Sequence, residues 1–194
     1  MILEGLVTTI DADGRMHVAA MGPAVDEHER EAGAITRLVL RPFGTSQTAA
    51  NLARYPEGVF HLTDDVLLLA RCVAGRLERP PEARPAELVR GHLLAAACRA
   101  YEFRIDAADA AAERQRLEAR VLREHAVRPF LGFNRAAHAV VEAAILVTRL
   151  HLTGPEAVAA RLADLEPLVE KTGGGREREA FAILRAAARP GDGR

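Results

Sequence analysis

Three hydroxyls and an amide stand together where a short helix is predicted to begin. Residues 49–54 have a helix-forming composition, and the positions just before them are Thr45, Ser46, Gln47 and Thr48. A helix N-terminus leaves backbone N–H groups unpaired and carries a partial positive charge, so hydroxyl donors there form a natural seat for a phosphate. Arg41 is close to this turn in sequence and could bind a phosphate through paired hydrogen bonds. Alternatively, Ser46 or Thr48 merely caps the helix, and the residues leave both interpretations open.

The other residues with catalytic or metal-binding chemistry form no known constellation. The seven histidines are scattered without metal-site spacing, and Ser46 lacks the flanking glycines of a hydrolase nucleophile. Asp64 and Asp65 could bind a metal, but capping of the next helix is the interpretation that the sequence favours. His138 and Glu142 share one side of a later helix, where a solvated face or a salt bridge explains them more simply. The residues alone identify no reaction.

The N-terminal segment is predicted to form a β-hairpin. Residues 2–10 and 16–21 are β-rich apolar runs, and the Asp13-Gly14 pair between them is a strong hairpin signal. A Gly-Pro pair then forces a turn. The polar residues 26–33 that follow are predicted to be an exposed connection.

The next elements surround the hydroxyl-rich turn. Residues 36–43 and 58–62 are predicted strands before and after it. Residues 66–73 form an apolar helix that should be buried on every side. The proline-rich residues 79–85 should be a connector without regular structure, and they mark the best internal boundary.

Residues 93–105 and 114–125 carry conflicting signals. Both are rich in alanine and arginine, which favours helix. However, their polar and apolar residues alternate with a period of two, which is typical of a half-buried strand. We therefore predict two antiparallel strands joined around residues 107–112.

From residue 133 onward the apolar pattern is helical. The first helix is predicted to bury one face, made of Phe133, Ala137, Val140, Val141, Ala144 and Thr148. Two more helices are predicted at residues 156–168 and 176–188, separated by a flexible break at 172–175 and followed by a disordered tail. Because strands come first and helices last, the sequence indicates an α+β fold.

Composition excludes several classes of function. The 194 residues carry a net charge of −1, with 4% aromatic residues and no tryptophan, which argues against nucleic-acid binding. No apolar run reaches transmembrane length and the N-terminus lacks signal-peptide features, so we expect no membrane association. Cys72 and Cys98 are isolated, which fits a reducing, cytoplasmic location.

The order of these segments resembles the FMN-binding split barrels, which include flavin reductases and pyridoxamine-phosphate oxidase-like proteins. More specifically, the chain is similar to domain of unknown function 447, whose members are split β-barrels with a helical C-terminal part. The matching pieces are EGLVTTID, AAMGPAV, GTSQTAANL, HLTDD and RPFLGFNRAAHAVVEAAILVTRLH, which together span residues 4–151. The resemblance implies an FMN-binding split β-barrel over residues 1–128, with a helical subdomain over residues 129–194 packed on it.

The resemblance also implies a cofactor site. It places the phosphate of FMN at Thr45, Ser46, Gln47 and Thr48, with Asn51 and Arg41 nearby. It places the flavin ring near Met21, Gly22 and Pro23, with ring or ribityl contacts from His61, Thr63 and Asp64, and it brings Asn134 and Arg135 toward the same pocket or the partner subunit. Many split barrels have Lys or Arg in the phosphate turn. Here the turn has Gln47 and hydroxyls instead, which leaves the charge partner of the phosphate open.

The function implied is a flavoprotein oxidoreductase or flavin reductase that passes electrons to an unidentified small molecule. The resemblance further implies a homodimer with two FMN sites at the interface. Two alternatives stay open: a non-enzymatic flavin carrier, sensor or scaffold, and a barrel that has lost FMN and binds a protein partner. The chain has no GxGxxG motif, so a stably bound nicotinamide dinucleotide is not indicated.

Overall fold

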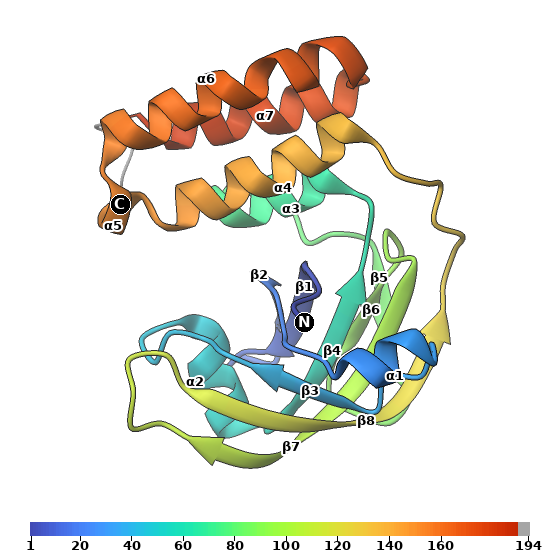
Figure 1. The fold of residues 1–194 in the computed structure, drawn as a ribbon. Helices are drawn as coiled ribbons and strands as arrows, with labels where there is room; N and C mark the ends of the chain where they lie inside the picture. The colour runs from blue at the N-terminus through green and yellow to red at the C-terminus, as the bar shows by residue number, and fades with distance from the viewer. Residues whose placement is uncertain (190–194) are drawn as a thin grey trace. The chain divides into compact units, whose positions relative to one another are not determined.

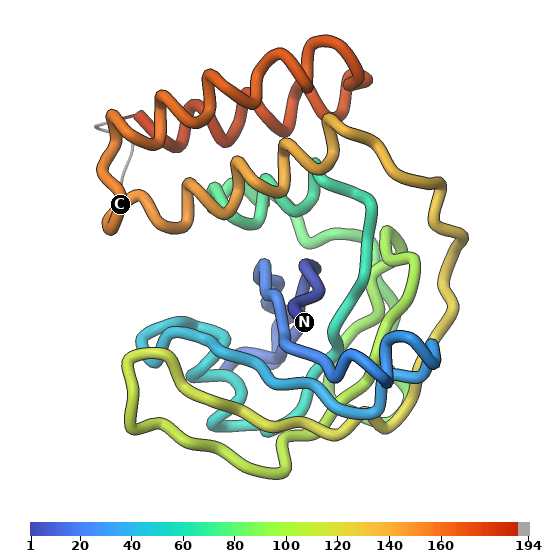
Figure 2. The backbone as a smooth tube through the Cα atoms, in the orientation of Figure 1, coloured from blue at the N-terminus to red at the C-terminus, as the bar shows by residue number. Residues whose placement is uncertain are grey.

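The computed structural model describes residues 1–189, which divide into two compact units (Figure 1). The first unit comprises Met1–Thr63 and Pro80–Phe130 and contains the strands. The second comprises Asp64–Arg79 and the described residues from Leu131 onward, and it is helical. Figure 2 traces how the chain leaves the first unit between two strands to form helix α3 (Val66–Val73) and then returns. This helix lies within residues 1–128, which the resemblance assigns to the barrel, and by its contacts it groups with the later helices.

Six strands form one sheet in the order β2-β1-β4-β7-β8-β3. Their bounds are β1 (Gly5–Ile10), β2 (Met16–Met21), β3 (Arg37–Leu40), β4 (Glu57–Leu62), β7 (Arg99–Asp109) and β8 (Arg116–Ala126). Every neighbouring pair is antiparallel. The protein is therefore a mixed α/β protein built on an antiparallel sheet, in agreement with the α+β class predicted from sequence.

The predicted hairpin of β1 and β2 is confirmed. Asp11 Oδ1 accepts the backbone N–H of Asp13 and of Arg15, both at 2.9 Å, which stabilises the turn. Gly14 has a φ of +79°, a conformation that glycine adopts without strain. The turn fixes the register that places Thr8 opposite Val18 and Thr9 opposite His17.

The period of two correctly predicted β7 and β8 as strands rather than helices. Tyr101 and Phe103 point to one face of the sheet and are buried, and the alternate residues Ala100 and Glu102 are buried on the other face. Residues 93–94, which the prediction joined to β7, belong instead to the separate strand β6 (His92–Leu94).

One apolar core lies along the inner face of the sheet. Its fully buried members are Val7, Leu38, Leu40, Phe60 and Phe103, each with 0% exposure. Leu52, from helix α2 (Gln47–Arg54), joins the same cluster. Burial of this leucine fixes α2 against the sheet.

The two edge strands, β2 and β3, are linked through the segment that follows β2. Ala24 forms single bridges with Ile2 and with Val39 of β3. The backbone groups of Ala24 and Val39 exchange two hydrogen bonds of 2.9 Å. Within the described residues the edges meet through these bridges and not through a strand pair.

Two segments predicted to be irregular contain regular structure. Helix α1 (Glu27–Glu31) lies in the predicted connection 26–33, where Asp26 accepts the N–H groups of His28 and Glu29 as an N-cap. It buries none of its residues, so its exposure was predicted correctly. Strand β5 (Ala83–Pro85) begins inside the predicted proline-rich connector and pairs with β6. Proline is compatible with such a short edge strand.

The second unit is a bundle of α3, α4 (Arg135–Thr148), α6 (Pro155–Thr172) and α7 (Gly175–Ala187), with the short α5 (Leu150–Thr153) between α4 and α6. Helix α4 contacts α3, α6 and α7, and Figure 1 shows α6 and α7 side by side. The predicted helices are confirmed. The predicted break at 172–175 is shorter, because α6 extends to Thr172 and α7 begins at Gly175. The predicted tail extends into residues 190–194, outside the described residues.

The buried side of α4 differs from the prediction. The helix buries Ala136, Ala139, Val140, Ala143 and Ala144. Phe133 precedes the N-cap Asn134 and is 88% exposed, because the helix begins later than its apolar pattern suggests. Small alanine side chains let neighbouring helices approach closely, so the alanine-rich side is the one that packs.

Candidate functional site

The hydroxyl-rich turn forms the entry to α2, and Ser46 is its N-cap. Ser46 Oγ accepts the backbone N–H of Ala49 at 3.2 Å and donates to the carbonyl oxygen of Phe43 at 2.7 Å. The cap interpretation is therefore correct for Ser46, whose hydroxyl is already used within the protein. Thr45, one residue earlier, is exposed.

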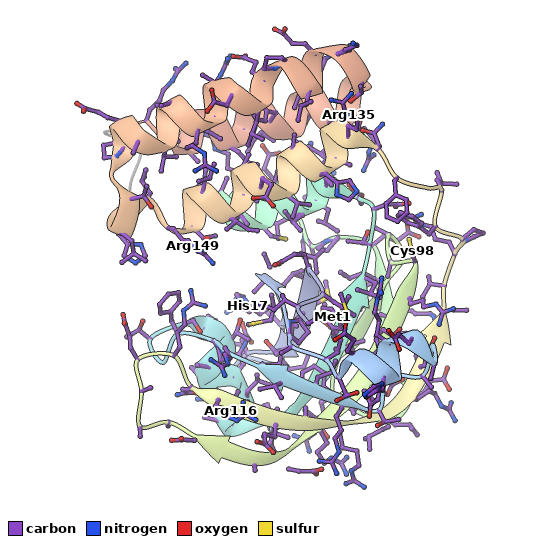
Figure 3. All side chains as sticks on the ribbon, in the orientation of Figure 1. Met1, His17, Cys98, Arg116, Arg135 and Arg149 are labelled. Atoms are coloured by element: carbon purple, nitrogen blue, oxygen red, sulfur yellow. The ribbon has the colours of Figure 1, made fainter. Side chains whose placement is uncertain are left out.

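The rest of α2 is tied to the sheet by polar side chains. Gln47 Nε2 donates to Asn51 Oδ1 at 2.7 Å, and Asn51 Nδ2 donates to Thr9 Oγ1 at 2.9 Å. Thr48 Oγ1 lies 3.4 Å from Nε2 of His17, which Figure 3 labels. Burial lowers the pKa of His17, against the opposing influence of the Asp11 carboxylate. Asn51 and Thr48 are buried, so they position α2 rather than offer free groups to a ligand.

The backbone N–H groups at the start of α2 are suitably placed to bind an anion. Among the described residues no protein group accepts the backbone N–H of Gln47 or of Thr48. The first turn contains no acidic residue that would compete for this position. Together with the exposed Thr45, these N–H groups present donors and a positive helix end at one place.

The residues predicted near the flavin ring lie at the end of β2. Met21 and Gly22 are half-buried and Pro23 is buried. The carbonyl oxygen of Pro23 already accepts the backbone N–H of Leu3 at 3.1 Å. A Cβ added to Gly22 would lie 2.8 Å from Ile2 Cγ2, so the backbone approaches the N-terminal segment closely here.

His61 has a structural role that the sequence did not reveal. It is fully buried on β4, with Nδ1 3.2 Å from the carbonyl oxygen of Leu6 and Nε2 accepting the backbone N–H of Leu94 at 3.2 Å. Burial lowers the pKa of His61 to about 4. Both ring nitrogens have partners inside the protein, so the ring links β1, β4 and β6. The flavin contact that the resemblance implies for His61 stays a prediction.

Thr63 lies beside a cavity of about 730 Å³. Its hydroxyl donates to the carbonyl oxygen of Ala96 at 2.7 Å, and Arg128 donates to the same oxygen at 2.9 Å. The lining also includes Cys98 and Phe130. The cavity therefore combines an apolar wall with polar groups that are already engaged.

Asp64, Asn134 and Arg135 lie in the helical unit. Asp64 Oδ2 accepts the backbone N–H of Leu131 at 3.3 Å. Asn134 caps α4 by accepting the N–H of Ala137 at 3.1 Å, and its amide donates to the carbonyl oxygen of Thr172 at 3.2 Å. Arg135 is exposed at the start of α4, where Figure 3 labels it.

Sequence reasoning missed a buried carboxylate on β7. Glu102, at 0% exposure, accepts the backbone N–H groups of Glu87 (2.9 Å), Leu88 (2.6 Å) and Val89 (3.1 Å), and it lies 2.7 Å from Nε2 of His125. Burial raises the pKa of Glu102, but these donors outweigh burial, so the pKa is lowered overall. The only sequence signal was the position of Glu102 in the alternating pattern of the strand.

Two features are absent from the described residues. Within residues 1–189, no group of three or more His, Cys, Asp or Glu residues is arranged to hold a metal ion. None of the helices in the same residues has the length and apolarity needed to cross a bilayer.

Comparison with solved structures identifies the fold. No curated protein matches the chain. A crystal structure of an FMN-bound DUF447 protein from Methanosarcina mazei matches over 96% of this chain and 94% of its own, with 21% identity and a TM-score of 0.79. The styrene monooxygenase flavin reductase of Pseudomonas putida S12 matches over 66% and 82%, with 11% identity and a TM-score of 0.52. The flavin reductase HpaC, solved with NADP+, matches over 69% and 82%, with 10% identity and a TM-score of 0.53.

Two family models divide the chain between them. The model described as "Protein of unknown function (DUF447) N-terminal domain" matches residues 3–128, and the model described as "Protein of unknown function (DUF447)" matches residues 134–186. The first of these alone covers more than half of the chain. The chain therefore belongs to the DUF447 family.

Proposed function

We propose that the chain binds FMN in its sheet unit, with the phosphate at the N-terminus of α2, and acts as a flavin reductase-like oxidoreductase on an unidentified small molecule. The observation that carries this proposal is the set of unpaired N–H groups of Gln47 and Thr48 beside the exposed Thr45, in a turn without acidic residues. The FMN-bound family member supports FMN as the ligand, and the flavin reductases of similar fold support a role in flavin chemistry.

In this proposal the protein binds and orients the cofactor. FMN, when bound, supplies the redox chemistry. The N–H groups at the start of α2 and the hydroxyl of Thr45 hold the phosphate, and Arg41 adds positive charge. The hydrogen bonds from Gln47 through Asn51 to Thr9 keep the helix fixed on β1. The reaction requires no acid or base from the chain, which fits the lack of a catalytic constellation in the sequence.

The flavin ring is proposed to lie along the end of β2, beside Met21, Gly22 and Pro23. The side chains of Ile2 and Glu4 fill the space that a Cβ at Gly22 would need, so a side chain at this position would have to displace them. Thr63 stays a proposed ribityl contact. Asp64, Asn134 and Arg135 stay predictions from the family resemblance.

We also propose a closed split barrel and a homodimer. The bridges of Ala24 to Ile2 and Val39 support closure of the sheet. Exposed apolar side chains support a partner subunit, since Leu131 is 89% and Phe133 88% exposed. Sedimentation equilibrium should give twice the chain mass of 21.0 kDa. A monomer at the concentrations where FMN binds would contradict the dimer.

Replacing Ser46 by aspartate tests the phosphate position. Aspartate can accept the N–H of Ala49 as serine does but cannot donate to the carbonyl oxygen of Phe43, so the free energy of unfolding should fall by about 1 kcal/mol. Its negative charge would face the phosphate, so the dissociation constant of FMN should rise about tenfold or more. Riboflavin lacks the phosphate and should bind as it does to the wild-type protein. Titrations followed by flavin fluorescence measure both ligands.

Ser46→Ala is the matched control for this variant. It removes the cap without adding charge, so it should lower the free energy of unfolding by about 1 kcal/mol and weaken FMN less than Ser46→Asp does. If Ser46→Asp binds FMN as tightly as the wild-type protein does, the phosphate does not bind at this end of the helix.

Reduction of the bound flavin tests the enzymatic part. An oxidoreductase should bleach the flavin absorbance in anaerobic mixtures with NADH or NADPH, faster than free FMN under the same conditions. Flavin that binds but is reduced no faster than free FMN by either donor would favour the carrier or sensor alternative.

A further inference from the structure

We propose that Arg114, in the loop between β7 and β8, supplies a positive charge for the FMN phosphate in addition to that of Arg41, because the hydroxyl-rich turn itself contains no lysine or arginine. The site would then select the phosphorylated flavin over riboflavin. This inference rests on the proposed FMN function and adds a residue that lies far from the turn in sequence. The sequence analysis left the charge partner of the phosphate open.

The loop that carries Arg114 runs alongside the turn. The backbone N–H of Gly44 donates to the carbonyl oxygen of Glu113 at 2.9 Å, and the N–H of Gln115 donates to that of Pro42 at 3.0 Å. Phe43 and Arg114 lie between these two hydrogen bonds and form an antiparallel bridge. The position of Arg114 beside the turn is therefore fixed by main-chain contacts on both sides.

The guanidinium of Arg114 lies over the ring of Phe43. Its Cζ lies 4.0 Å from the centroid of the Phe43 ring, which is a cation–π contact. Stacking uses the face of the guanidinium and leaves the N–H donors at its edge available. A pre-oriented guanidinium of this kind suits paired hydrogen bonds to a phosphate.

Phe43 connects Arg114 to the start of α2. The carbonyl oxygen of Phe43 accepts both the backbone N–H of Ser46 at 2.9 Å and the Ser46 hydroxyl at 2.7 Å. Phe43, whose ring contacts the guanidinium of Arg114, is thus bound through its main chain to the N-cap of the helix. The cation and the free N–H groups of the first turn belong to one local structure.

Arg114 also differs in charge pairing from the other arginines of the β7–β8 hairpin. Arg99, Arg104, Arg116, Arg120 and Arg123 each form an ion pair with a Glu or Asp side chain. Within the described part of the hairpin, Arg114 is the one arginine for which no carboxylate partner is found. Its charge is therefore available to an anion, and its exposure lets a ligand reach it.

The test compares FMN and riboflavin binding to the full chain with three variants. Arg114→Ala should weaken FMN about 10- to 100-fold, the effect of losing a charged hydrogen-bonding partner, and should leave riboflavin unchanged. Arg114→Lys keeps the charge without the paired donors, so its FMN affinity should lie between those of the wild-type protein and Arg114→Ala. Arg120→Ala, which removes an exposed, ion-paired arginine further along β8, should bind both flavins like the wild-type protein.

The outcomes separate this inference from the function on which it rests. A wild-type protein that binds neither flavin overturns both. If the wild-type protein binds FMN and Arg114→Ala binds it within twofold as tightly, the phosphate role of Arg114 is overturned and the FMN function stands. Equal losses of FMN and riboflavin in Arg114→Ala also overturn the role, because they would reflect damage to the fold. Unchanged riboflavin binding shows that the variant is folded.

Discussion

Replacing Glu102 by alanine should lower the free energy of unfolding by about 3–5 kcal/mol, as expected when one member of a buried charged network is removed. The carboxylate accepts three backbone N–H groups from residues 87–89, and His125 lies within hydrogen-bonding distance. Without it, these three partly buried N–H groups would lose their acceptor, and each loss adds to the destabilisation. Urea denaturation monitored by circular dichroism measures the change.

The matched control for Glu102 is Glu118→Ala on β8. Glu118 is 45% exposed and paired with Arg116, so its loss should cost no more than about 1 kcal/mol. Glu102→Gln should give an intermediate result, because its amide oxygen can still accept hydrogen bonds. A Glu102→Ala protein as stable as Glu118→Ala would contradict the role given to the buried carboxylate.

Glu102 also makes the free energy of unfolding depend on pH. Its pKa is lowered in the folded protein, so its contribution is present above the unfolded pKa, near 4.5, and is lost as the pH falls through the lower folded pKa. This loss occurs at a more acidic pH than most of the loss caused by His61. The contributions of Glu102 and His61 to the pH dependence of stability can therefore be measured separately.

Acidification from pH 7 to pH 4 should lower the free energy of unfolding by about 3 kcal/mol through the titration of His61 alone. Burial lowers the pKa of His61 from 6.5 to about 4. Between these values the unfolded chain takes up a proton that the folded protein does not, so stability falls as the pH falls through the window. Urea denaturation at several pH values measures this slope.

The His61→Gln variant should lose most of this slope, whatever its stability at neutral pH. His28→Gln is the matched control, because His28 is exposed on α1 and its replacement should leave the slope unchanged. A His61→Gln protein with the wild-type pH dependence would show that His61 is not the group that titrates.

The elements that local sequence signals specify were predicted well. The Asp13-Gly14 turn defined the hairpin of β1 and β2, and the period of two identified β7 and β8 in spite of their helix-forming composition. These signals depend on neighbours in sequence. The prediction failed on α4 for a local reason, since the helix begins only after Asn134 and leaves Phe133 outside it.

The buried polar groups could not be predicted because their partners are distant in sequence. Glu102 binds backbone groups 13 to 15 residues away, and His61 binds Leu6 and Leu94, 55 and 33 residues away. A backbone N–H donor can belong to any residue except proline, so the sequence does not show which residues will donate. The same holds for Arg114, whose stacking on Phe43 follows from the pairing of its loop with the turn and not from any motif.

The phosphate site stays a prediction. The sequence suggested the turn from Thr45 to Thr48 as a place for a phosphate, and within the part of the chain that the structure describes no group accepts the N–H of Gln47 or Thr48. It could not distinguish the capping hydroxyl of Ser46 from the exposed one of Thr45. That distinction depends on the hydrogen bonds from Ser46 to Phe43 and from Ala49 to Ser46, which only the folded turn defines.

The most direct test of the account is the visible absorption spectrum of the purified protein before and after addition of FMN. The account predicts flavin bands that shift on binding and a saturable titration with FMN. A colourless protein that leaves the spectrum of added FMN unchanged, with no saturable binding, would contradict the central claim that this chain is a flavoprotein.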